Sequence, residues 1–337
     1  MSRHAAARGT SQATVSDSQK PESSRLSWWW KAPLSALLVG ILAIMVSTIA
    51  FGATRPNTGN PPAPEASASS TPPSVLHSPL VAPPELAPAP DLPELDAQIA
   101  AIEEKYNVTI GISITPVAGV YQRQQATWYG GTLRSGDALA TIDVAMALAI
   151  LDQERQPQQR DYMFNKALAD DSAAGDEALW AFLGTAEQAA SATTQVLRDY
   201  ADHRTTVPSS GVGGDSSSPY LATQWALDQQ SQLMAALRCD YSRVNPVLSK
   251  LNDPADNPWG LQTLPMSYSK GAWGVTSNGG MLVRQFGLIR LADGNTVGIA
   301  MAASQASEDP AVGRAAITEL SNQVRRLATG FDDARCS

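Results

Sequence analysis

The amino-acid sequence predicts an α+β fold, with an antiparallel five-stranded sheet, flanking terminal helices and an inserted helical subdomain. Along the chain, the hydrophobic pattern gives a helix, two strands, a long helical stretch, three strands and a last helix. The turns between the last strands are short, which favours antiparallel pairing. These elements span about 235 residues, a size typical of one domain.

The predicted domain begins near Glu94 with a helix, because apolar residues recur at helical spacing. These residues are Leu95, Ile99 and Ile102. A strand is expected over 108–115, where Val and Ile alternate with other residues. A second strand is expected over 126–129, and the two glycines that follow it end the strand.

The middle of the domain reads as helical. Residues 137–153 form a strongly apolar stretch that predicts a buried helix, and 161–200 predicts further helices broken near Gly184. Residues 205–220 are rich in Ser, Gly and Pro and predict a loop. A helical pattern returns over 221–252. This region is the predicted insertion between the second and third strands.

The last part of the domain predicts three strands, over 265–274, 281–291 and 296–303. An Asp-Gly pair at 293–294 is a hairpin signal between the last two strands. A closing helix is expected from Pro310 to Leu327, with proline at its first turn. The predicted domain therefore covers 94–328, followed by a tail over 329–337.

The first 93 residues predict a membrane anchor and a spacer. Residues 32–53 carry no charge and are long enough to cross a bilayer. Three tryptophans and Lys31 precede them, which favours a cytoplasmic tail over 1–31. Residues 54–93 hold 12 prolines and predict an extended spacer. We expect a single-pass protein of the cytoplasmic membrane, with its N-terminus inside and its domain outside; a cleaved signal peptide is the alternative.

Charge and cysteine content narrow the function classes. Residues 32–337 carry 19 basic and 30 acidic residues, a poor match for nucleic acid. The two cysteines, Cys239 and Cys336, both lie in the part expected outside the cytoplasm, where a disulfide is chemically possible. The alternative is one buried thiol and one free thiol in the tail. The sequence has no cluster of His and Cys, so no metal and no cofactor are expected.

Short segments in a characteristic order carry a family resemblance. They are ALATIDVAMAL at 138–148, DDSAA at 170–174, ALW at 178–180, WGL at 259–261, SKGAWG at 269–274 and LVRQFG at 282–287. The chain thereby resembles class A β-lactamases and the penicillin-binding transpeptidases and carboxypeptidases, in particular an actinobacterial branch, across nearly all of 94–328. That family uses Ser-x-x-Lys at the start of a buried helix, Ser-Asp-Asn on the helical subdomain and Lys-Thr-Gly on the third strand.

The sequence departs from the family at the catalytic positions. Ala140 stands where the resemblance implies the nucleophilic serine, and Asp143 stands where it implies the lysine. The middle motif reads Asp170-Asp171-Ser172, with a register that is open by one residue. Serine and lysine act as a unit, so their joint loss predicts a protein without the family's covalent chemistry.

Only the strand motif is retained, as Lys270-Gly271-Ala272. The resemblance implies that Lys270 holds a ligand carboxylate and that backbone amides beside it form an oxyanion hole. A structural salt bridge between Asp143 and Lys270 is the plainer alternative.

We therefore expect a non-catalytic, membrane-anchored protein of the cell wall that binds peptidoglycan stem peptides or a wall-synthesis protein. One rival is a weakly active hydrolase, of the β-lactamase or D,D-carboxypeptidase type, with a displaced nucleophile. Another is a purely structural partner protein whose cleft is vestigial.

Overall fold

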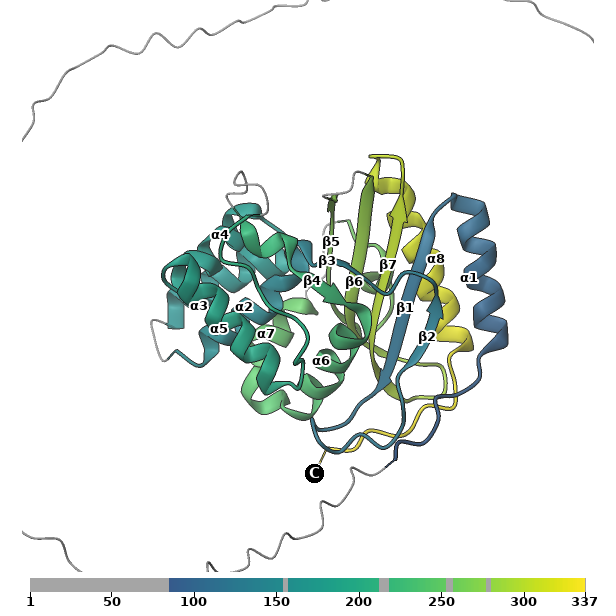
Figure 1. Cartoon of the computed structure of the whole chain (residues 1–337). Helices are drawn as coiled ribbons and strands as arrows, with labels where there is room; N and C mark the ends of the chain where they lie inside the picture. The colour runs from purple at the N-terminus through teal and green to yellow at the C-terminus, as the bar shows by residue number, and fades with distance from the viewer. Residues whose placement is uncertain (1–84, 154–156, 212–217, 253–256, 277–279, 337) are drawn as a thin grey trace, which may run out of the picture. The chain divides into compact units, whose positions relative to one another are not determined.

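The computed structural model describes residues 85–153, 157–211, 218–252, 257–276 and 280–336 (Figure 1). The predicted cytoplasmic tail, the predicted membrane span and residues 54–84 of the predicted spacer lie outside these residues. Within the described ranges, no helix has the length and apolar character needed to cross a membrane.

A five-stranded antiparallel sheet in the order β2-β1-β7-β6-β5 forms the centre of the fold, which confirms the predicted fold class. Its strands are β1 (Thr109–Pro116), β2 (Trp128–Gly131), β5 (Tyr268–Val275), β6 (Met281–Arg290) and β7 (Thr296–Gln305). The predicted Asp-Gly turn joins β6 to β7, and Gly294 has a φ of 95°, a conformation that favours glycine. Strand β5, which carries the Lys-Gly-Ala motif, lies at one edge.

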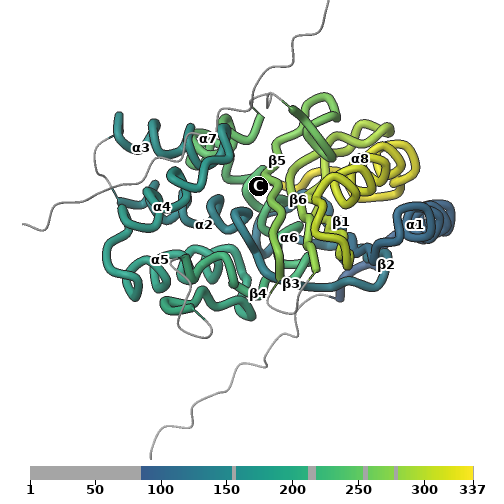
Figure 2. Tube along the Cα trace, turned by 90° about the horizontal axis from the view of Figure 1, so that it is seen from above, coloured from purple at the N-terminus to yellow at the C-terminus, as the bar shows by residue number. Residues whose placement is uncertain are grey.

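Helices cover both faces of the sheet (Figures 1 and 2). Helices α1 (Pro93–Tyr106) and α8 (Pro310–Leu327) pack together on one face, and α6 (Leu227–Cys239) packs on the other. The isoleucines of β1 point toward the α1 and α8 side. The alternate side chains, Ser113 and Thr115, are also buried, because α6 packs on this face, and both hydrogen-bond Ser231 of α6. The alternation in this strand therefore separates two buried faces.

The inserted helical subdomain surrounds α2 (Asp143–Leu151), whose side chains are almost all buried. The other helices of this subdomain are α3 (Pro157–Phe164), α4 (Ala173–Phe182), α5 (Ala186–Asp199) and α7 (Tyr241–Leu251). The predicted break falls at Gly184, whose φ is 114°. Figure 2 shows these helices gathered on the side of the sheet away from α1 and α8.

Three local features differ from the sequence expectation. Strand β2 includes Gly130 and Gly131, which were expected to end it, because both glycines pair with β1. The helix predicted over 137–153 starts later, because a 3-10 turn, η1 (Leu139–Ile142), precedes α2. A second, two-stranded sheet pairs β3 (Ser135–Asp137) with β4 (Gln224–Ala226), and no hydrophobic pattern predicted it. Each strand has only three residues, too few for a periodic pattern.

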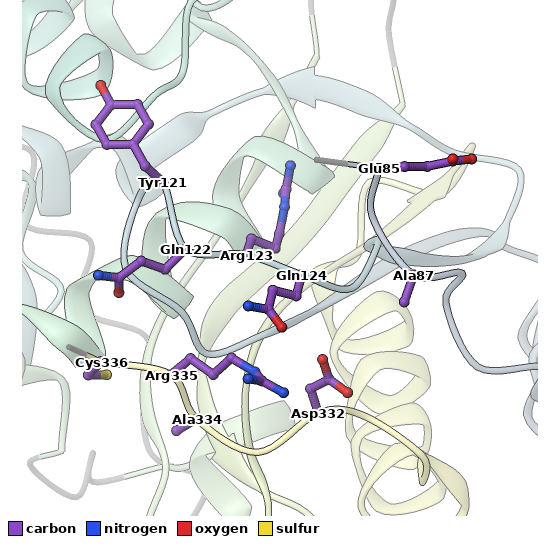
Figure 3. A pocket seen from close by; sticks show the side chains of 10 residues that line it. All are labelled: Glu85, Ala87, Tyr121, Gln122, Arg123, Gln124, Asp332, Ala334, Arg335 and Cys336. Carbon is purple, nitrogen blue, oxygen red and sulfur yellow. The ribbon is translucent and has the colours of Figure 1, made fainter. Parts of the chain in front are cut away.

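The described residues on either side of the predicted domain, 85–93 and 329–336, belong to the folded body. Ala87 pairs with Gln125, and Arg335 pairs with Ala118, through isolated bridges. Phe331 is buried among the side chains of α1, α8 and the sheet. Side chains from residues 85–87, 121–124 and 332–336 surround a shared hollow (Figure 3). Cys336 closes this end of the chain through a disulfide to Cys239 of α6.

Candidate functional site

The candidate site lies where η1, α2, the start of α4 and strand β5 meet. Ala140 is in η1 and is partly buried against the core of the helical subdomain. Leu139, the residue before it, has a φ of 53° and is therefore held in a strained left-handed conformation. The turn that presents Ala140 is thus sharply bent, but it presents only a methyl group.

The ammonium group of Lys270 is enclosed by acceptors of the protein itself. Lys270 is 2% exposed; its Nζ donates to the carbonyl oxygen of Ala167 at 2.6 Å and to the carboxylate of Asp171. Asp143 lies 3.5 Å from the same nitrogen and is completely buried. Burial lowers the pKa of Lys270, but the negative charges of Asp143 and Asp171 outweigh that effect, so the net pKa is raised. Lys270 therefore stays charged and already has carboxylate partners.

The three residues of the middle motif have separate positions. Asp171 contacts Lys270, whereas Asp170 forms a salt bridge with Lys166 at the surface. Ser172 is the N-cap residue of α4, without a side-chain capping bond. A π-helical turn, η2 (Asn165–Ala169), precedes the motif and takes up one more residue per turn than an α-helix would. The sequence left the register of this motif open, and in the structure Asp171 is the residue that lies beside Lys270.

A second buried carboxyl group, that of Asp176 in α4, completes the cluster. No motif in the sequence predicts a role for Asp176. The carboxyl groups of Asp143 and Asp176 act on each other electrostatically, and both oxygens of Asp143 are buried without a hydrogen-bond partner among the described residues. Burial raises the pKa of Asp143 well above its usual range, although Lys270 acts in the opposite direction. Burial also raises the pKa of Asp176, and its contacts with Asp143 and Lys270 partly offset the rise. The raised pKa favours a protonated Asp143.

We expect Asp143→Asn to stabilise the fold, increasingly as pH rises. A carboxyl group whose folded-state pKa is raised contributes its full stability below the unfolded value of 3.8 and loses it as pH rises through the folded pKa. Asparagine has nearly the same shape and does not ionise, so the variant should gain about 1–2 kcal/mol over the wild type at neutral pH and almost nothing in acid. Urea denaturation across this pH range measures the difference.

Asp170→Asn is the matched control for this prediction, because Asp170 is exposed and pairs only with Lys166 among the described residues. Its effect should stay within about 1 kcal/mol at any pH. A loss of stability in Asp143→Asn at neutral pH would contradict the proposed protonation.

A buried arginine supports the turn that carries Ala140. Arg284 of β6 is completely buried, and its guanidinium donates to the carbonyl oxygens of Gly136, Asp137 and Trp225 and to the side chain of Gln230. Gln230 in turn donates to the hydroxyl of Thr141, next to Ala140. Burial lowers the pKa of Arg284 to about 9, which leaves it charged at neutral pH. The sequence did not reveal this role, because the groups that Arg284 binds are mostly backbone carbonyls far away in the chain.

No complete nucleophile and base pair is found among the described residues of this site. The Thr141 hydroxyl is buried and already donates to the carbonyl oxygen of Ala138. Lys166 is the lysine closest to Ser172 in the sequence, and it is already paired with Asp170. The described part of the chain also contains no group of His, Cys, Asp and Glu side chains arranged to hold a metal ion. In its described residues, the site is a buried charge cluster.

The comparison with solved structures identifies the fold. The chain is similar to the TLA-1 extended-spectrum β-lactamase, with a TM-score of 0.54 and 13% identity over 69% of this chain and 97% of that one. It is also similar to a β-lactamase from Chitinophaga pinensis, with a TM-score of 0.56 and 12% identity over 70% of this chain and 100% of that one. A β-lactamase from Sphaerobacter thermophilus gives a TM-score of 0.52 at 15% identity, with 70% and 98% covered. This protein therefore has a class A β-lactamase/transpeptidase-like fold. No family model and no curated protein sequence matches the chain.

Proposed function

We propose that this protein is a non-catalytic member of the β-lactamase-like fold that acts as a scaffold at the cell wall. The observation that carries the proposal is the methyl group of Ala140 at the start of the central helix, where the family resemblance implies a nucleophilic serine. Asp143, which takes the position of the lysine, is buried and cannot act as an amine base.

The charges of the site favour scaffolding over capture of a ligand carboxylate. Lys270 is buried and is held by Asp171, Asp143 and a backbone carbonyl group. An incoming carboxylate would have to displace Asp171 from Lys270. The charge-assisted hydrogen bond that the ligand gains would be of similar strength to the bond that Asp171 loses. Binding of peptidoglycan stem peptides through Lys270 is therefore expected to be weak, and a wall-synthesis protein is the partner class we favour.

The proposal puts the folded domain outside the cytoplasm on a single-pass anchor, with the N-terminus inside. It rests on the uncharged stretch 32–53 and on the basic residues before it. Protease added to intact cells should then cleave the proline-rich spacer, and full protection of the chain would argue against this topology.

We expect no covalent adduct when the full-length protein is incubated with benzylpenicillin, because Ala140 offers no atom that can be acylated. Intact-mass spectrometry measures the adduct, and the heat-denatured protein controls for slow modification of surface lysines. A stoichiometric adduct on the native protein only, mapped to one hydroxyl, would instead support the weak hydrolase with a displaced nucleophile.

A further inference from the structure

A groove opens at the end of the sheet where β5 begins and β6 ends. It has a volume of about 440 Å³. Residues of α6, α7, β5, β6 and β7 line it, together with the turns before β5 and after β6. The side chains that matter here are Arg238, Tyr241, Met266, Tyr268 and Arg290. We call this feature the Arg–Tyr groove. None of the residues of the buried charge cluster line it.

Both arginines of the groove lack an acidic partner among the described residues. The Arg238 guanidinium lies over the ring of Tyr241, 5.5 Å from its centroid, and Arg290 donates to the carbonyl oxygen of Gly294 at 3.2 Å. Asp240, next to Tyr241 in the chain, is already bound by Arg243 and by the hydroxyl of Tyr200. The groove is therefore positively charged on a chain whose residues 32–337 have 11 more acidic than basic residues.

Apolar side chains are exposed in the same groove. Met266 is 59% exposed, and its φ of 56° is unusual for a residue other than glycine. Tyr241 is also exposed and lines the groove together with Tyr268. Methionine, tyrosine and arginine are the residue types that are enriched at protein interfaces. An unbranched thioether also adapts easily to the shape of a bound side chain.

We propose that the Arg–Tyr groove binds an acidic peptide segment that places one large aliphatic side chain between two carboxylates. The aliphatic side chain packs on Met266 and the tyrosine rings, and the carboxylates face Arg238 and Arg290. Charge complementarity selects this occupant, since a basic segment would meet two arginines without acidic partners. Such binding is separate from the proposed scaffold function and does not depend on the state of the Ala140 site.

The test uses fluorescence anisotropy with the full-length protein and two labelled peptides, Gly-Glu-Glu-Leu-Glu-Glu and Gly-Lys-Lys-Leu-Lys-Lys. We expect saturable binding of the glutamate peptide only, weakening as salt is added because exposed charges are screened. The double variant Arg238→Glu/Arg290→Glu should lose at least about tenfold in affinity for it and gain binding of the lysine peptide. Arg325→Glu, an exposed arginine on α8, should change neither affinity.

Three results would overturn the proposal. The wild type could fail to bind the glutamate peptide, or the double variant could bind it as well as the wild type does. A peptide with glycine in place of leucine could also bind equally well, which would reduce the interaction to general attraction between charges. Circular dichroism tests whether the double variant is folded. The gain of lysine-peptide binding is a second readout, which misfolding cannot produce.

Discussion

Replacing Lys270 with methionine is expected to lower the free energy of unfolding by about 3–5 kcal/mol at neutral pH. Methionine fills nearly the same volume, so the loss reports charge rather than a cavity. Without the ammonium group, Asp143 and Asp176 remain buried with no cation among the described residues beside them, and Ala167 loses the donor to its carbonyl oxygen. Below the unfolded pKa of 3.8, both carboxyl groups are protonated and the loss should shrink.

Lys166→Met is the control for this prediction, because Lys166 forms an exposed salt bridge with Asp170 on the same part of the subdomain. Exposed pairs are worth at most about 1 kcal/mol, so this variant should be nearly neutral. Denaturant unfolding of both variants at neutral and acid pH gives the comparison. If Lys270→Met is as stable as Lys166→Met at neutral pH, the lysine does not compensate the buried carboxyl groups.

Arg284→Met is expected to cost about 3 kcal/mol or more, because two buried carbonyl groups and one partly buried one lose their charged donor at once. Two of these carbonyl groups belong to β3 and one to β4, so Arg284 joins the small sheet to the large one. The amide of Ala138 donates to Thr223, just before β4. Loss of Arg284 should therefore also loosen the turn around Ala140.

Arg290→Met provides the control on the same strand, since Arg290 is exposed and donates only to Gly294 among the described groups. Its effect on stability should stay below about 1 kcal/mol. Hydrogen exchange separates the local from the global effect: Arg284→Met should speed exchange at Ala138 more than in β7. Equal protection of Ala138 in both variants would show that the turn is held by other contacts.

Hydrophobic periodicity was enough to predict most of the fold. The helix with Leu95, Ile99 and Ile102 and the closing helix from Pro310 to Leu327 lie where the pattern puts them. The start of α2 was harder to place, because residues 143–150 are all buried and an apolar run has no face that marks where the helix begins. The change from 3-10 turn to helix at Asp143 is therefore set by packing around it.

The candidate site was only partly predictable from the sequence. Motif spacing singled out Ala140, Asp143 and Lys270, and the structure brings Asp143 and Lys270 together. The spacing did not reveal that Asp171 rather than Asp170 contacts the lysine, because that choice depends on a π-helical turn without a clear sequence signal. The roles of two further residues were not predicted, because tertiary contacts bring their partners near; they are Asp176 and Arg284.

The disulfide between Cys239 and Cys336 makes one part of the chain cyclic and leaves the part before it linear. The cysteines are 97 positions apart, so the bond closes a covalent ring that contains α7, strands β5 to β7 and α8. Lys270 and Arg284 belong to this ring, whereas Asp143, Asp171 and Asp176 lie on the open chain before it. A ring of this length restricts the unfolded chain by about 4–5 kcal/mol. Lys270 is therefore carried by a cyclic segment, whereas the carboxyl groups around it belong to the linear segment before the ring.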